Sequence, residues 1–183
     1  MSYDNVTSPA SLKYAHIERE RRFLLQKRPT GIAVGRELWI QDRYLIGSTL
    51  RLRRVEEIGL PTQYKLGQKI RIDNFSPLKV AHTTMYLSEA EFDILATLPA
   101  KTLEKTRLVI PVGDLMLALD EFGDRLAGLF LAEIDLGVAG LMPELHPIEL
   151  VTEVTDDERF TGGALSDTTK DDLFQLLMDY GVK

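Results

Sequence analysis

The stretch that decides the fold is His16-Ile17-Glu18-Arg19-Glu20-Arg21-Arg22-Phe23-Leu24-Leu25, near the start of a 183-residue chain. Because successive side chains of a β-strand point to opposite faces, a strand here places Glu18, Glu20 and Arg22 on one face. Two carboxylates on a dry face repel each other unless something compensates their charge. The stretch is therefore either a solvent-exposed edge strand, which often carries charge, or a strand whose acidic pair holds a hard cation such as Mg²⁺ or Mn²⁺.

The composition is that of a soluble globular protein and predicts a single domain over 14–183 after a flexible tail at 1–13. The chain has no cysteine, which excludes a thiolate metal site and fits the reducing cytoplasm, where we expect the protein. No apolar run of ~18 residues predicts a membrane helix, and Met1–Lys13 is too polar for a secretory signal. A net charge of −6 argues against a general nucleic-acid binder. The three histidines share no ligand spacing, so we expect them to be surface or packing residues.

Eight segments have the composition and alternation of strands, and most are joined by short turns. They cover 16–25, 37–46, 49–55, 63–72, 79–87, 102–110, 115–122 and 128–136. Residues 73–77 have a loop composition, a capping box of Ser88 and Glu91 predicts a helix to about Thr97, and leucines at helical spacing predict another over 168–180. This pattern is typical of an antiparallel barrel or sandwich with a few covering helices.

Charged side chains repeatedly share one strand face, opposite an apolar face. They are Arg51 with Arg53, Lys65 with Lys69, Lys105 with Arg107, Glu133 with Asp135, and Asp120 on a strand of its own. The default interpretation points these charges at solvent. If the apolar faces instead point outward against helices, the interior is a polar tunnel with a basic lining and an acidic cluster. Basic groups bind phosphate oxygens and carboxylates hold the divalent cations that neutralise phosphate charge, so a metal–polyphosphate ligand satisfies both sets.

Taken in order, these motifs resemble those of the CYTH domains, also called triphosphate tunnel metalloenzymes. Glu18, Glu20 and Arg22 stand at the three places of the family's Glu-x-Glu-x-Lys strand. Further similar segments are Gln41 with Tyr44-Leu45, Leu50-Arg51-Leu52-Arg53, Lys65, Lys105-Thr106-Arg107, Asp120-Glu121-Phe122, Gly128-Leu129 with Glu133-Ile134-Asp135, and Glu153-Val154-Thr155. The resemblance covers residues 15 to about 160. It implies a mainly β fold: an eight-stranded antiparallel β-barrel tunnel with a few covering helices.

The resemblance also implies a function, namely a divalent-metal-dependent hydrolase of triphosphate substrates, with inorganic triphosphate favoured and Mg²⁺ or Mn²⁺ as cofactor. It implies metal ligation by Glu18, Glu20, Glu133 and Asp135, with Asp120 as a further ligand. It implies phosphate binding by Arg22, Arg51, Arg53, Lys65, Lys69, Lys105 and Arg107, with Glu18, Glu20 and Arg22 at the catalytic positions. The expected partner is a triphosphate-bearing small molecule, with neither nucleic acid nor membrane; a homodimer is left open.

Two positions depart from the family pattern. Arg22 replaces a lysine; arginine keeps the charge but hardly ever loses its proton, so we expect phosphate clamping and not proton transfer there. The segment 79–87 has Ala81, His82 and Thr83 where an Arg-x-Glu pair is expected, which predicts a different substrate preference.

Three alternatives remain open at the level of sequence. A class IV-type adenylate cyclase would use the same tunnel, with the ribose 3′-hydroxyl attacking the α-phosphorus of ATP. A non-enzymatic polyphosphate- or nucleotide-binding module would be stabilised by its ligand without turnover. A barrel with solvated charges and an apolar ligand inside would show no phosphate-dependent stabilisation.

Overall fold

The computed structural model describes residues 13–71, 79–137 and 140–182. The predicted loop at 73–77 and nearly all of the predicted tail lie outside these residues. The strands are β1 His16–Leu25, β2 Arg36–Leu45, β3 Leu50–Glu57, β4 Gln63–Arg71, β5 Lys79–Leu87, β6 Ala100–Val112, β7 Leu115–Phe122, β8 Phe130–Asp135 and β9 Leu150–Glu153. The helices are α1 Glu89–Ala96, α2 Gly162–Leu165 and α3 Lys170–Asp179, with 3₁₀ turns η2 Asp124–Leu126 and η3 Glu158–Phe160.

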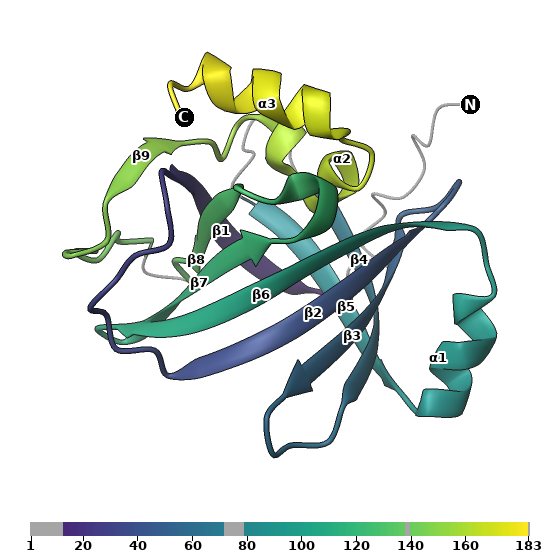
Figure 1. Ribbon diagram of the computed structural model, residues 1–183. Helices are drawn as coiled ribbons and strands as arrows, with labels where there is room; N and C mark the ends of the chain where they lie inside the picture. Colours follow the sequence, from purple (N-terminus) through teal and green to yellow (C-terminus); the bar gives the residue numbers. More distant parts are fainter. Residues whose placement is uncertain (1–12, 72–78, 138–139, 183) are drawn as a thin grey trace.

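Strands β1 to β8 form a closed antiparallel barrel, which confirms the predicted fold (Figure 1). The order around the barrel is β1-β8-β7-β6-β2-β3-β4-β5, and β1 closes it. On one edge of β1, residues 16–19 pair with β5 and residues 23–25 pair with β9. The other edge pairs with β8 through residues 20–25. Because β1 joins three strands, its Glu-x-Glu-x-Arg motif lies at the seam of the barrel.

The apolar strand faces point outward and are covered, as the tunnel interpretation required. On one flank, Leu108, Leu117 and Leu119 pack with Leu145 and Ile148 from the connector that follows β8. These side chains are nearly inaccessible to solvent, so the connector replaces water as their neighbour.

Helix α1 covers the flank formed by β3, β4 and β5. Its Phe92 packs against Leu45 and Leu52. The helix begins at the predicted capping box: Ser88 Oγ accepts from the Glu91 backbone N–H, and the Glu91 carboxylate accepts from the Ser88 N–H at 2.7 Å. The backbone N–H groups at the start of the helix are therefore hydrogen-bonded, which stabilises a helix of only two turns beside the apolar face of these strands.

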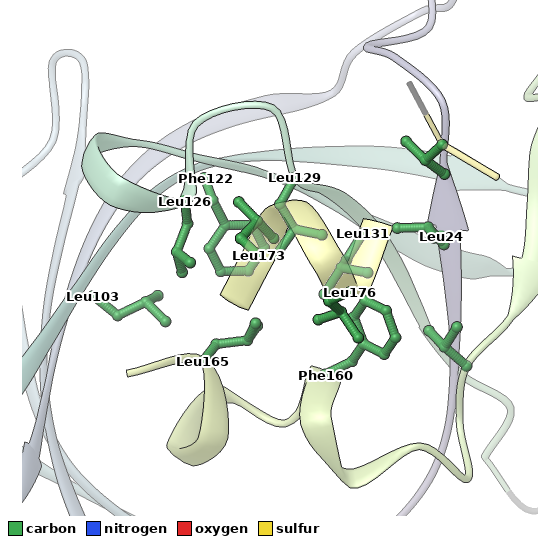
Figure 2. Packing of buried hydrophobic residues seen from close by; sticks show 12 residues of the cluster. Leu24, Leu103, Phe122, Leu126, Leu129, Leu131, Phe160, Leu165, Leu173 and Leu176 are labelled. Atoms are coloured by element: carbon green, nitrogen blue, oxygen red, sulfur yellow. The ribbon is translucent and has the colours of Figure 1, made fainter. Parts of the chain in front are cut away.

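The C-terminal segment closes one end of the barrel; Figure 1 shows α2 and α3 lying across that end. Figure 2 shows Phe160, Leu165, Leu173 and Leu176 of this segment meeting side chains of the barrel strands and of the β7–β8 connection. The barrel side of the cluster consists of Leu24, Leu103, Phe122, Leu126, Leu129 and Leu131. Among the described residues no helix is both long and apolar enough to cross a membrane.

Only the middle of the lumen is ionic, so the expected polar tunnel is shorter than the barrel. Leu103, Phe122 and Leu131 share strand faces with charged lumen residues yet belong to the apolar cluster at the C-terminal end. A second apolar cluster lies farther along the same strand faces and contains Leu38, Ile40, Val55 and Val109. Along β2 and β6 the charged middle is therefore flanked by apolar side chains on both sides.

Candidate active site

A cavity of about 550 Å³ lies in the lumen of the barrel. Its acidic, basic and histidine side chains are Glu18, Glu20, Arg22, Arg51, Arg53, Lys69, His82, Lys105, Arg107, Glu133 and Asp135. The structure thus brings most of the predicted site residues together, from five strands that are dispersed in the sequence. Strand alternation is the reason, since every one of these residues occupies the inward position of its strand.

Strands β1 and β8 place acids and bases in direct opposition. In the register of this pair, Glu20 faces Asp135 and Arg22 faces Glu133. Arg22 Nε donates to Glu133 Oε1 at 2.8 Å, and its Nη2 lies 3.9 Å from Glu20 Oε2. Burial by itself raises the pKa of Glu133, but Arg22, Lys105 and Arg107 outweigh burial and hold it well below its usual range. Glu133 is therefore a fixed negative charge inside the barrel.

Glu18 lies between an imidazole and an ammonium group. His82 Nδ1 lies 2.7 Å from Glu18 Oε1 and must donate, because an ionised carboxylate only accepts. Lys69 Nζ lies 2.9 Å from Glu18 Oε2 and 3.0 Å from Glu20 Oε2. Burial raises the pKa of Glu18, but His82 and Lys69 outweigh it and lower the pKa from 4.5 to about 2. Glu18 consequently stays ionised at any physiological pH.

Asp42 anchors the two arginines of β3. It is 0% exposed and faces Arg53 across the β2–β3 pair. Arg53 donates to both of its carboxylate oxygens, at 2.7 and 2.8 Å, and Arg51 Nε lies 3.5 Å from Oδ1. Burial raises the pKa of Asp42, but Arg53 and Arg51 lower it well below its usual range. A buried carboxylate thus fixes both guanidinium groups against the cavity wall.

Asp120 anchors the two cationic side chains of β6, Lys105 and Arg107, in the same way. Lys105 Nζ donates to its Oδ2, and the Arg107 guanidinium donates to both oxygens at 2.6 Å. Asp120 is 1% exposed and lies behind the cavity lining, not in it. Cations of this chain contact both of its oxygens, and the metal ligation that we predicted for Asp120 stays a prediction. Its geometry is that of a counter-ion for Lys105 and Arg107.

Lys65 is the other predicted residue outside the cavity lining. Its ammonium lies 5.0 Å from the centre of the Tyr86 ring, in a cation–π contact, and Tyr86 is largely exposed. The strand alternation that placed Lys65 with Lys69 is correct, but Lys65 lies four residues farther along a tilted strand. The structure therefore does not bring Lys65 to the ionic centre.

His82 and Asp42 belong to the site although neither was among the predicted metal-binding, phosphate-binding or catalytic residues. We expected His82 to be a packing or surface residue, yet it lines the cavity and binds Glu18. A signal existed for Asp42, because it alternates with Leu38, Ile40 and Tyr44 and is the one acid on an otherwise apolar face. His82 gave no such signal, because it stands in a stretch, 80–87, that has no charged side chain beside it.

The residues fit the divalent cation that the fold implies, although no three acidic or histidine side chains in the described part of the chain converge ready to share an ion. Glu18 Oε2 is buried and lies 2.9 Å from the Lys69 ammonium, a singly charged group in the place of a cation. Glu20 and Asp135 face each other across the β1–β8 pair; Asp135 Oδ1 accepts from the backbone N–H groups of Arg19 and Gly137 at 2.9 and 3.0 Å. Carboxylate oxygens in this arrangement are the donor set that Mg²⁺ and Mn²⁺ prefer.

The closed barrel with an ionic centre is the fold that the resemblance to the CYTH domains implied. Two crystal structures of the inorganic triphosphatase NE1496 share it, each with a TM-score of 0.52. They are 23% and 22% identical to this chain, covering 82% and 83% of it and 95% and 99% of their own chains. The PH1012 protein from Pyrococcus horikoshii OT3 is 12% identical, with 91% of each chain covered and a TM-score of 0.48, and carries no weight here. Neither family models nor curated protein sequences match the chain.

Proposed function

We propose that the protein is a divalent-metal-dependent hydrolase of triphosphate substrates, with inorganic triphosphate favoured and Mg²⁺ or Mn²⁺ as the cofactor. One observation carries the proposal: fixed guanidinium groups and ionised carboxylates line the same lumen cavity. A barrel that binds an apolar ligand in its lumen would need neither these guanidinium groups nor these carboxylates there. The shared fold with an inorganic triphosphatase supports the choice of substrate.

The reaction requires water to attack the terminal phosphorus while the bond from that phosphorus to the bridging oxygen breaks, releasing phosphate and pyrophosphate. Glu18, Glu20 and Asp135 would hold the cation, which supplies charge neutralisation and lowers the pKa of water. Arg22, Arg51, Arg53, Lys105 and Arg107 would orient the phosphate chain through charge-assisted hydrogen bonds. Arg22 contributes charge and direction, not a proton, since its guanidinium stays protonated.

Positioning, more than acid–base chemistry, is what this cavity supplies. Asp42 and Asp120 hold four of the lining cations in place before any ligand arrives. In phosphoryl transfer most of the catalysis comes from positioning and electrostatic stabilisation, so groups that are fixed beforehand lose little entropy on binding. The buried counter-ions therefore favour a phosphate ligand of defined shape.

The test is phosphate release from inorganic triphosphate by purified protein with Mg²⁺ or Mn²⁺. Glu18→Gln and Glu20→Gln should each lower the rate by about 10- to 100-fold or more, because they remove a carboxylate of the metal site. Glu149→Gln, which removes the same charge from an exposed position, serves as the matched control. If the wild-type protein released no more phosphate than the two variants, the hydrolase proposal would be wrong. Chromatography of products from ATP separates hydrolysis from formation of cyclic AMP.

A further inference from the structure

Lys69 has an unusual place in the ionic centre. It comes from β4, two strands away from β1, and its side chain reaches past β5 to the acidic pair. Its ammonium lies within 3.0 Å of oxygens of both Glu18 and Glu20. Those are the two carboxylates of the Glu-x-Glu motif, and a positive charge between them is what relieves their repulsion.

The position of this ammonium group conflicts with a metal ion at the same carboxylates. A divalent cation must lie within about 2.0–2.6 Å of its oxygen ligands. An ammonium already seated between the two carboxylates fills that space, and its charge repels the incoming cation. Lys69 can also leave these carboxylates easily. Its side chain is 34% exposed, and its ammonium group stands on a flexible stem of four carbons.

We propose that Lys69 is a tethered counter-ion that holds the metal position between Glu18 and Glu20 in the metal-free protein and is displaced when a divalent cation binds. The proposal depends on the proposed function in one respect: a divalent cation must bind to these two carboxylates. Displacement releases a positive charge into the same cavity that contains Arg22 and Arg107. Lys69 thus sets the metal concentration at which the site loads and then becomes available to a phosphate ligand.

Burial by itself lowers the pKa of Lys69, but Glu20, Glu133 and Glu18 outweigh burial and raise it. The ammonium form is therefore the one present at neutral pH, and metal binding has to compete with it. A purely structural ion pair would behave differently: its loss would destabilise the protein without increasing the affinity for metal.

The test measures binding of Mn²⁺ alone, by calorimetric titration of wild-type protein and of Lys69→Gln without any phosphate compound. Lys69→Gln should bind Mn²⁺ at least about tenfold more tightly, because the competing charge is gone. Lys27→Gln makes the same change at an exposed site outside the cavity and should bind like wild type. Lys69→Arg, which keeps the charge, should bind no more tightly than wild type and gives a second comparison if Lys69→Gln folds poorly.

Equal or weaker Mn²⁺ binding by Lys69→Gln would overturn the proposal, as would tighter binding by Lys69→Arg or no binding by any variant. None of these results depends on turnover. If Lys69→Gln binds Mn²⁺ more tightly while no variant releases phosphate, the counter-ion is supported and the hydrolase proposal alone fails.

Discussion

At the level of single residues, the two most buried carboxylates in the barrel matter because they hold cations, not because they hold a ligand. Asp120 contacts Lys105 and Arg107, and no other carboxylate lies so close to Lys105 among the described ion pairs. Burial lowers the pKa of Lys105, and Asp120 opposes that shift. Asp120 therefore favours the charged form of Lys105, which burial disfavours.

Asp120→Asn should lower the free energy of unfolding by about 3–5 kcal/mol, the usual result of removing one partner from a buried ion pair. Urea denaturation at neutral pH measures it. Glu121→Gln is the control, because Glu121 is the next residue, points outward and pairs with Arg28 on the surface; it should change stability by about 0–1 kcal/mol. Equal losses in the two variants would mean that the buried pairs contribute no more than surface pairs.

Strand alternation explains why so many site residues could be predicted from the sequence. Once β1, β3, β6 and β8 are recognised as strands, period two groups Glu18, Arg51, Lys105 and Glu133 with the other charged residues on one face of each strand, and the resemblance to the tunnel family makes that face the interior. Alternation gives the face of a residue but not its height along a tilted strand, which is why Lys65 was placed with Lys69. Nor does it show which side chains meet across the lumen, so the contact of His82 with Glu18 could not be foreseen.

At the level of elements, the closure of one barrel end rests on a close approach between β2 and α2. A Cβ added at Gly162 would overlap the hydroxyl of Tyr44. Arg125 fixes the same region, since its guanidinium donates to the carbonyl oxygens of Thr102, Ser166 and Thr168 at 2.8–3.0 Å. The C-terminal segment is thus seated on the barrel by shape at Gly162 and by hydrogen bonds at Arg125.

Gly162→Ala should destabilise the protein by about 1–3 kcal/mol, as overpacking does in a filled interior. In a Tyr44→Ala background the same substitution should cost much less, because the overlapping hydroxyl and ring are gone. A double-mutant cycle from urea denaturation gives the coupling between the two positions. Strict additivity would show that α2 moves freely away from Tyr44 and does not seal the lumen there. Gly163→Ala, beside which a Cβ meets no atom, is the control.

The same segment contains a carboxylate whose ionisation stabilises it. Arg159 above all, and Tyr180 with it, lowers the pKa of Asp157 from 3.8 to about 2. A carboxylate with a depressed pKa stabilises the fold above its unfolded pKa, and this contribution is lost as the pH falls through the folded value. The difference in unfolding free energy between wild type and Asp157→Asn should therefore be largest near pH 6 and decrease between about pH 4 and pH 2.

Urea denaturation of both proteins at several pH values between 3 and 6 measures that difference. Asp156→Asn removes a charge from the exposed neighbouring residue and serves as the control. A difference that stays constant from pH 6 to pH 3 would mean that the contacts of Asp157 with Arg159 and Tyr180 do not depend on its charge.

The elements that the sequence predicted are those with a long periodic pattern or a cap. Helix α1 and helix α3 both begin at capping boxes, at Ser88 and Thr169, and the eight barrel strands alternate clearly. Strand β9 and helix α2 were not predicted, because four residues contain too little of either period. Two glycines at the start of α2 further weaken any helical signal. Such short elements form through tertiary packing against the barrel.

For the whole molecule, the central question is the charge of the lumen. The cations along the cavity are Arg22, Arg51, Arg53, Lys69, Lys105 and Arg107; the carboxylates beside them are Glu18, Glu20, Asp42, Asp120, Glu133 and Asp135. The two sets are equal in number, so the ionic centre is nearly neutral within a chain of net charge −6. A triphosphate brings several negative charges into this space, and the protein alone has no surplus of cations to neutralise them.

Metal and triphosphate should therefore bind cooperatively. In a thermal unfolding experiment, triphosphate with EDTA should raise the melting temperature only slightly, and Mn²⁺ alone should have a modest effect because Lys69 competes with it. Together they should raise it by more than the sum of the two, by about 2–4 °C for each kcal/mol of coupling in a chain of this size. The excess should largely disappear in Glu18→Gln, whose lumen offers the cation one carboxylate fewer. Full stabilisation by triphosphate in EDTA would mean that the lysines and arginines bind it unaided. Mn²⁺ would then act, if at all, on the chemistry and not on binding.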